Sequence, residues 1–199
     1  DRHELLNIYH YNKSEKKSIL KENITIHKNA IIDCSFMSIS ELQDFIEKEI
    51  CDCKEKSMLL SLHLKASMMK VSDPIIFGHV LKVFFKNFIE KNSTTLDKIN
   101  VNFNSGLSNL FEKINQLDNP TKEKLVNEIE LDIENGPDLA MVNSEKNITN
   151  FHIPSDVIID ASMPAMIKSS GKMWNKNGEL RDTKAIIPDS SYSSIYQAT

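Results

Sequence analysis

The sequence predicts an α/β fold, a mixed sheet with flanking helices, and two neighbouring segments carry this prediction. Residues 60–64 alternate leucine with serine or histidine, which is the period of a β-strand with one apolar and one polar face. A helix follows, with Asp73 at the N-cap and Pro74 at the first helical position, and its apolar side chains recur at helical spacing to about Lys91. A strand, a tight connection and a helix in this order indicate a βαβ element.

The residues before this unit predict strands and then one helix. Two alternating segments, 5–11 and 22–27, flank a polar, lysine-rich stretch and indicate a β-hairpin, or two strands on a longer loop. Residues 30–33 add a short strand. A helix then begins at Ser38, where Glu41 three residues later completes a capping-box pattern ahead of an apolar stripe.

The residues after this unit continue the mixture of helices and strands. In chain order we expect a strand at 98–103, a short helix at 108–117, a helix from 119 that Gly136-Pro137 ends, a strand at 139–142, a loop at 143–150, a buried run at 157–159 and a short helix at 161–171. The remaining tail is expected to be rich in loops, with one apolar run at 185–187.

Composition excludes several classes of partner. The chain has 199 residues, 40% apolar and 26% charged, as in an ordinary globular protein with a real core. Its net charge of −4 offers no basic field for nucleic acid. No apolar run approaches the ~20 residues that span a bilayer, so no membrane partner is expected. Three cysteines without framework spacing favour reduced thiols and a cytoplasmic location.

Lys65 is the first candidate for chemistry. It ends an apolar strand and projects toward the polar side that carries Ser61 and His63. Spacing alone favours an ordinary surface lysine at a strand end. The functional alternative is a lysine in a cleft, where burial or a nearby cation lowers its pKa enough for base chemistry. A Schiff-base lysine of an aldolase type is a further alternative.

Asp160 is the second candidate. It closes a short apolar run at 157–159 and precedes a helix. Carboxylates at such junctions offer the hard oxygen ligands that Mg²⁺ or Mn²⁺ requires. The alternative, which spacing alone favours, is an N-cap for the following helix.

Two long blocks resemble one family. Residues 59–78, LLSLHLKASMMKVSDPIIFG, and residues 139–174, which contain PSDVIID, resemble the monomeric-type NADP-dependent isocitrate dehydrogenases of bacteria. Residues 182–197, DTKAIIPDSSYSSIYQ, continue the similarity. The helix from Ser38 and residues 100–114 also fit the family pattern, whereas residues 1–30 fit it in outline and the last two residues depart from it.

This resemblance implies a reaction, cofactors and two site residues. The family oxidises isocitrate with NADP⁺ and decarboxylates the product to 2-oxoglutarate, as a cytoplasmic monomer of the tricarboxylic acid cycle and glyoxylate bypass. A divalent cation, Mg²⁺ or Mn²⁺, polarises the developing carbonyl. The lysine of the family's HLK motif is Lys65, which implies a catalytic residue that also contacts substrate. The last aspartate of PSDVIID is Asp160, which implies a metal ligand.

The same resemblance implies an incomplete site. Family members are much longer, so residues 1–199 correspond to a single partial domain, a central fragment of the larger of two domains. The catalytic tyrosine, the arginines, the other metal-binding aspartates and the NADP-binding residues fall outside it. The chain also lacks an initiator methionine, as expected if it begins inside a longer protein. We therefore expect the fragment alone to be inactive, and the alternative is a degenerate, non-catalytic remnant serving as a structural or binding module.

Overall fold

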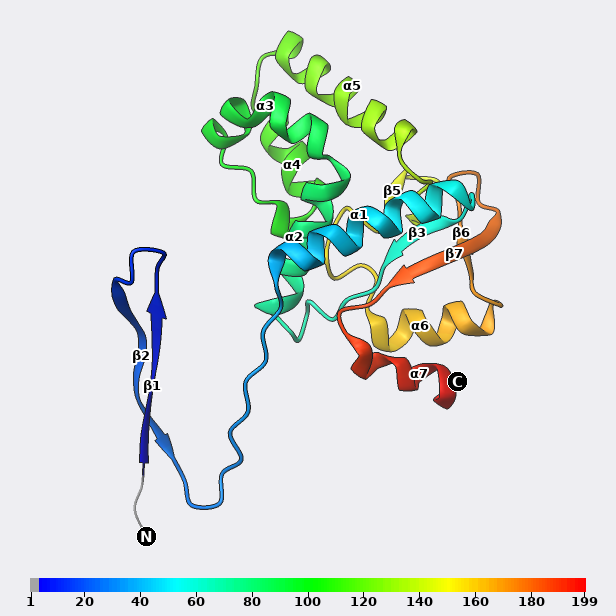
Figure 1. Ribbon diagram of the computed structural model, residues 1–199. Helices are drawn as coiled ribbons and strands as arrows, with labels where there is room; N and C mark the ends of the chain where they lie inside the picture. The colour runs from blue at the N-terminus through cyan, green and yellow to red at the C-terminus, as the bar shows by residue number, and fades with distance from the viewer. Residues whose placement is uncertain (1–3) are drawn as a thin grey trace. The chain divides into compact units, whose positions relative to one another are not determined.

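Two units follow one another in the computed structural model, which describes residues 4–199 (Figure 1). The first ends at Met37 and the second comprises Ser38–Thr199. The extent of a larger domain that would contain both stays a prediction.

The first unit is the predicted β-hairpin. Strand β1 (Glu4–Tyr11) pairs antiparallel with β2 (Lys17–Ile26), and the ammonium of Lys17 lies 3.6 Å from the centre of the Tyr9 ring. The strand predicted at residues 30–33 is wrong, because this segment forms no regular element and pairs with no strand among residues 4–199. An apolar run becomes a strand only where a partner edge is available to its backbone.

The second unit contains seven α-helices and five strands among the described residues. The helices are α1 (Ile39–Glu55), α2 (Ser72–Phe84), α3 (Lys86–Lys98), α4 (Leu107–Ile114), α5 (Asn119–Asn135), α6 (Ile159–Lys168) and α7 (Ser194–Ala198). The strands are β3 (Leu59–Leu62), β4 (Met141–Asn143), β5 (Ile148–Thr149), β6 (Lys172–Trp174) and β7 (Leu180–Ile186). Short 3₁₀ helices are η1 (Phe103–Ser105) and η2 (Ser190–Ser193).

Helices with strong local signals begin and end where the sequence predicts. The backbone N–H of Glu41 donates to the Ser38 hydroxyl at 3.4 Å, which caps α1. The N–H of Thr121 donates to the Asp118 carboxylate at 3.1 Å at the start of α5, and Gly136 occupies the C-cap. The predicted short helix at 108–117 is confirmed as α4.

The helix predicted from Asp73 to about Lys91 is two helices. The chain breaks at Phe85 (φ −100°, ψ 28°), and α3 then continues to Lys98. The strand predicted at 98–103 is therefore wrong, since its first residue is still helical and η1 begins at its end. Phe85 is fully buried, so tertiary packing outweighs the continuous helical pattern of this segment.

The principal sheet has the strand order β3-β7-β6 and is mixed, as predicted. Strand β7 runs parallel to β3, with Leu59 opposite Thr183, and antiparallel to β6. The expectation of a loop-rich tail is wrong, because β7 from this tail is the middle strand. Figure 1 shows α1 and α6 to either side of β3 and β7, so helices flank the sheet.

Smaller pairings extend β3. The predicted strand at 139–142 is present as β4, which pairs antiparallel with β5 inside the segment 143–150 that we expected to be a loop. Leu139 forms a parallel bridge with Leu60, and Leu64 forms another with Ile158. The segment before β4 therefore lies beside β3, and the segment before α6 lies beside the residues that follow β3.

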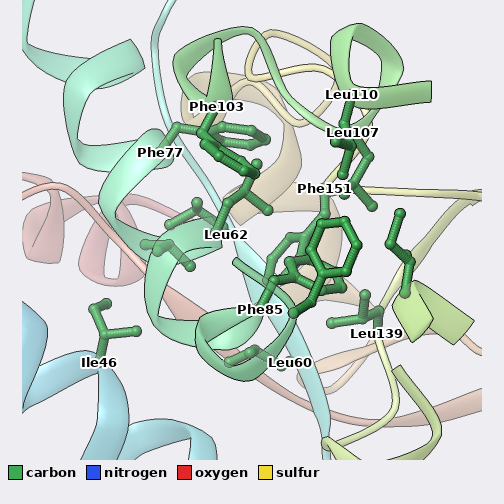
Figure 2. Close-up of a cluster of buried hydrophobic side chains, with 14 of the residues drawn as sticks. Ile46, Leu60, Leu62, Phe77, Phe85, Phe103, Leu107, Leu110, Leu139 and Phe151 are labelled. Carbon is green, nitrogen blue, oxygen red and sulfur yellow. The ribbon is translucent and has the colours of Figure 1, made fainter. Parts of the chain in front are cut away.

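Buried aromatic and leucine side chains form one core in the second unit (Figure 2). The residues labelled in Figure 2 are Ile46, Leu60, Leu62, Phe77, Phe85, Phe103, Leu107, Leu110, Leu139 and Phe151. The rings of Phe84 and Phe151 meet edge to face, with centres 5.2 Å apart. Strand β3 contributes leucines to this core, and the core fixes the strand end that Lys65 follows.

Candidate active site at Lys65 and Asp160

Backbone hydrogen bonds bring Lys65 and Asp160 together. The N–H of Leu64 donates to the carbonyl of Val157 at 3.2 Å, and the N–H of Ile159 donates to the carbonyl of Leu64 at 2.8 Å. Lys65 and Asp160 each follow this parallel bridge by one or two residues. They therefore leave the pairing at the same end, although they lie far apart in the sequence.

The two side chains form an ion pair. The Nζ atom of Lys65 lies 2.5 Å from Oδ2 of Asp160, and the side chains are 21% and 48% exposed. The Asp160 carboxylate accepts a hydrogen bond from Lys65 and raises the pKa of that lysine, so the ammonium form is favoured here. The simple surface lysine favoured by spacing is thus a partly buried, paired lysine.

Asp73 fixes the backbone of Lys65. Asp73 is 2% exposed, and its carboxylate accepts the backbone N–H of Lys65 at 2.7 Å on one oxygen. The hydroxyl of Ser72 donates to the other oxygen at 2.9 Å. The prediction that Asp73 caps the following helix is wrong, because Val71 holds the N-cap position. Its carboxylate holds the turn that begins at Lys65 instead.

Asp160 lies in the first turn of α6. The N-cap position belongs to Ile158, so the alternative that Asp160 is the N-cap is wrong. A carboxylate in the first turn is stabilised by the positive end of the helix dipole. The side chain of Asp160 is half exposed and is directed to Lys65.

The polar side of β3 is buried. Ser61 and His63, which alternate with the leucines, are both inaccessible to solvent. The Oγ of Ser61 lies 2.9 Å from Nε2 of His63, and Oγ of Ser162 lies 2.7 Å from Nδ1. The amide nitrogen of Asn150 donates to Ser61 at 2.9 Å. A polar chain thus connects β3 with the first turn of α6.

Tyr192, in η2, is a neighbour of the pair that sequence reasoning missed. Burial, followed by the charge of Asp73, raises the pKa of its phenol, and the nearby charge of Lys65 opposes that rise. No periodicity identifies this tyrosine, because it lies in a short 3₁₀ turn. The only sequence signal is its place within the block 182–197.

The described residues offer one suitable ligand for a divalent metal ion, but they do not form a complete metal site. Asp160 offers a hard, half-exposed oxygen ligand of the kind that Mg²⁺ and Mn²⁺ prefer. Across residues 4–199, no three side chains of His, Cys, Asp or Glu lie close enough together to hold a metal. No helix in this same range is long and apolar enough to cross a membrane.

Comparison with known proteins decides the family. The family model described as monomeric isocitrate dehydrogenase matches residues 1–199, the whole of the sequence. The chain belongs to the monomeric isocitrate dehydrogenase family. The resemblance carried by the blocks around Lys65 and Asp160 is confirmed.

Curated relatives agree with this assignment. The chain is 46% identical over 185 residues to the isocitrate dehydrogenase (NADP) of Azotobacter vinelandii, with 93% of this chain and 25% of the relative covered. It is 46% identical over 179 residues to an isocitrate dehydrogenase (NADP) 2 of a Psychrobacter species, covering 90% of this chain and 24% of the relative. The corresponding protein of Mycobacterium tuberculosis is 45% identical, with 93% and 25% covered. The chain thus spans about a quarter of the length of these relatives.

Proposed function

We propose that this chain supplies a catalytic lysine and one metal-binding carboxylate to a longer, NADP-dependent isocitrate dehydrogenase. The observation that supports this most directly is the 2.5 Å contact between Lys65 and Asp160. The two residues come from the two blocks that resemble the family, and the fold places them side by side. Family membership then indicates which chemistry such a pair serves.

The proposed reaction is the oxidation of isocitrate with hydride transfer to NADP⁺, followed by loss of carbon dioxide to give 2-oxoglutarate. We assign Lys65 to the substrate hydroxyl, whose oxygen its side-chain nitrogen would bind and whose proton it would accept as the hydride leaves. Asp160 raises the pKa of Lys65 and favours the ammonium form, which cannot accept a proton, so this role requires the neutral amine. A divalent cation held at Asp160 would replace that ion pair and favour the neutral form. Asp160 would supply one oxygen ligand to Mg²⁺ or Mn²⁺, which polarises the substrate oxygen when bound. Lys65 would exchange its present partner, Asp160, for the substrate.

The setting of this reaction is part of the proposal. The chain would form a partial domain of the larger of two domains, with NADP bound by residues outside it. We propose a cytoplasmic monomer that acts in the tricarboxylic acid cycle and glyoxylate bypass. The family description and the relatives' names support the monomer and the cofactor. Three free cysteines, Cys34, Cys51 and Cys53, suit a reducing compartment.

The first experiment extends the coding sequence on both sides, expresses the full-length protein and measures NADPH formation from isocitrate with Mn²⁺. Lys65→Met should lower kcat at least about a hundredfold, the lower end of what general acid–base groups contribute, while isocitrate binding is partly kept. Lys82→Met changes an exposed lysine of α2 and should leave kcat unchanged.

Two outcomes would contradict the proposal. Near-normal turnover by the Lys65→Met variant would remove the catalytic role of this lysine. Stop codons on both sides of the chain would favour a degenerate remnant over an enzyme.

A further inference from the structure

We propose that His63 is a positioning residue for Asp160 and acts through the hydroxyl of Ser162. This inference rests on the proposed metal-binding role of Asp160. It concerns a fully buried side chain next to the end of β3, whose ring nitrogens bond to Ser61 and Ser162 and not to the Lys65 ammonium or the Asp160 carboxylate.

Because His63 is fully buried, both of its ring nitrogens need hydrogen-bond partners within the protein. An imidazole removed from water needs hydrogen bonds at both ring nitrogens, since each unpaired polar group costs about 1–3 kcal/mol. Both nitrogens have one: Nδ1 lies 2.7 Å from Oγ of Ser162, and Nε2 lies 2.9 Å from Oγ of Ser61. The ring therefore joins Ser162 of α6 to Ser61 of β3.

The hydrogen bonds that link Asn150, Ser61, His63 and Ser162 all run in one direction, from donor to acceptor. The carbonyl of Ile158 can only accept, so the Ser162 hydroxyl donates to it at 2.9 Å. Ser162 must then accept from Nδ1–H of His63, which leaves Nε2 as the acceptor for the Ser61 hydroxyl. Ser61 in turn accepts from the amide of Asn150 at 2.9 Å. One neutral tautomer of His63, protonated at Nδ1, satisfies every link.

The electrostatics of the site agree with a neutral ring. Burial lowers the pKa of His63 to about 4, so the imidazole carries no charge near pH 7. A neutral ring has one donor and one acceptor, which is what Ser162 and Ser61 require.

This series of hydrogen bonds ends at the helix turn that carries Asp160. Ile158 is the N-cap residue of α6 and has no capping side chain, and its carbonyl accepts from the N–H groups of Ala161 and Ser162 as well as from the Ser162 hydroxyl. Asp160 lies inside this turn. The backbone of Leu64 holds the turn from one side, through Ile159 N–H, and His63 holds it through Ser162.

Residues that orient a metal ligand through hydrogen bonds commonly change metal affinity by 10–100-fold when they are lost. His63 would act in this way on the helix turn rather than on the carboxylate itself. A purely structural histidine would instead affect stability through both ring nitrogens alike. The two possibilities are separable, because asparagine places its amide near the Nδ1 position and glutamine places its amide near the Nε2 position.

The experiment uses the full-length protein and Mn²⁺ alone as the probe, with free Mn²⁺ counted by electron paramagnetic resonance. His63→Gln and Ser162→Ala should each weaken Mn²⁺ binding about tenfold, because both remove the link to the turn. His63→Asn keeps a donor for Ser162 and should recover most of the affinity. The Mn²⁺ concentration for half-maximal activity should shift in parallel.

Ser169→Ala, at the other end of α6, is the matched control and should bind Mn²⁺ as the unmodified protein does. Circular dichroism checks the fold of each variant. If His63→Gln fails to fold, Ser162→Ala, which removes a single oxygen atom at a half-buried position, decides the matter alone. The inference is overturned if Ser162→Ala binds Mn²⁺ normally, or if His63→Asn and His63→Gln are equally impaired.

Asp160→Asn separates this inference from the proposed function. If that variant binds Mn²⁺ as well as the unmodified protein does, the metal role of Asp160 fails, and this inference fails with it. If Asp160→Asn weakens binding and Ser162→Ala does not, the proposed function stands and only the positioning role of His63 is lost.

Discussion

Two aspartates hold Lys65 beyond the end of β3, one through its side chain and the other through its backbone. Asp160 pairs with its ammonium at 2.5 Å, and Asp73 accepts its backbone N–H at 2.7 Å. The first contact sets where the side chain points, whereas the second sets where the backbone turns. Loss of either partner should therefore have a different consequence for the full-length protein.

Asp160→Asn should raise the Mn²⁺ concentration needed for half-maximal activity by about tenfold or more, since an amide oxygen is a weaker ligand than a carboxylate for a hard cation. The measurement is a Mn²⁺ titration of NADPH formation. Asp156→Asn changes a carboxylate four residues earlier that forms no ion pair with Lys65 among residues 4–199, and should leave the titration unchanged. An unaltered titration in the Asp160 variant would refute its role as a ligand.

Asp73→Ala should lower both stability and kcat. It leaves the buried N–H of Lys65 without its acceptor, which costs about 1–3 kcal/mol, and it frees the turn that presents the lysine. Asp73→Asn keeps an acceptor oxygen and should lose less. Thermal unfolding and steady-state kinetics of the two variants check this, and equal loss in both would contradict the positioning role of the accepted hydrogen bond.

At the scale of elements, a lysine in the middle strand ties the sheet to α1. The ammonium of Lys184 in β7 contacts Glu49 at 2.6 Å and also contacts Asp52, both on α1. Hydrogen bonds from Lys184 and then Lys56 lower the pKa of Asp52. Strand β7 carries polar side chains such as Lys184, which bonds to α1, so it lacks the apolar alternation expected of a middle strand.

Lys184→Met should lower the thermal midpoint by a few degrees at pH 7, because both carboxylates of α1 lose a partly buried partner. Since the folded-state pKa of Asp52 is lowered, this stabilisation is present above its ordinary value of 3.8 and is lost as pH falls through the folded-state pKa. The difference between variant and unmodified protein should therefore vanish in strong acid. Lys56→Met, which removes a more exposed partner of Asp52 alone, is the control and should change the midpoint less.

At the scale of the whole molecule, the chain covers about a quarter of its relatives. The described residues provide the Lys65–Asp160 pair and no group of three metal-ligating side chains within residues 4–199. Catalysis by the family chemistry needs further ligands and a cofactor site.

The 199-residue chain expressed alone should therefore form no NADPH from isocitrate, NADP⁺ and Mn²⁺, whereas the full-length protein should do so. Both are measured in one absorbance assay at equal protein concentration. Turnover by the isolated chain would show that the site is complete within it and would contradict the proposal.

Local signals in the sequence determined the helix capped by Ser38, the helix that begins at Asn119, the N-terminal hairpin and the choice of Lys65 and Asp160 as candidates. Each of these depends on a few neighbouring residues, such as a capping hydroxyl or an alternating run, so a single sequence is sufficient. The family followed from two motif blocks that can be read without a structure.

Only the tertiary structure decided that Lys65 touches Asp160, that Asp73 holds the Lys65 backbone, and that His63 is buried in a polar chain. It also decided that β7, from a tail that resembled a loop, is the middle strand. The Lys65–Asp160 contact and the place of β7 depend on pairing between segments distant in sequence, where one backbone supplies the partner that the other needs. The Asp73 contact instead spans eight residues and depends on how the chain turns after Lys65. No local pattern contains that information, because the partner's identity is set by how the whole core packs.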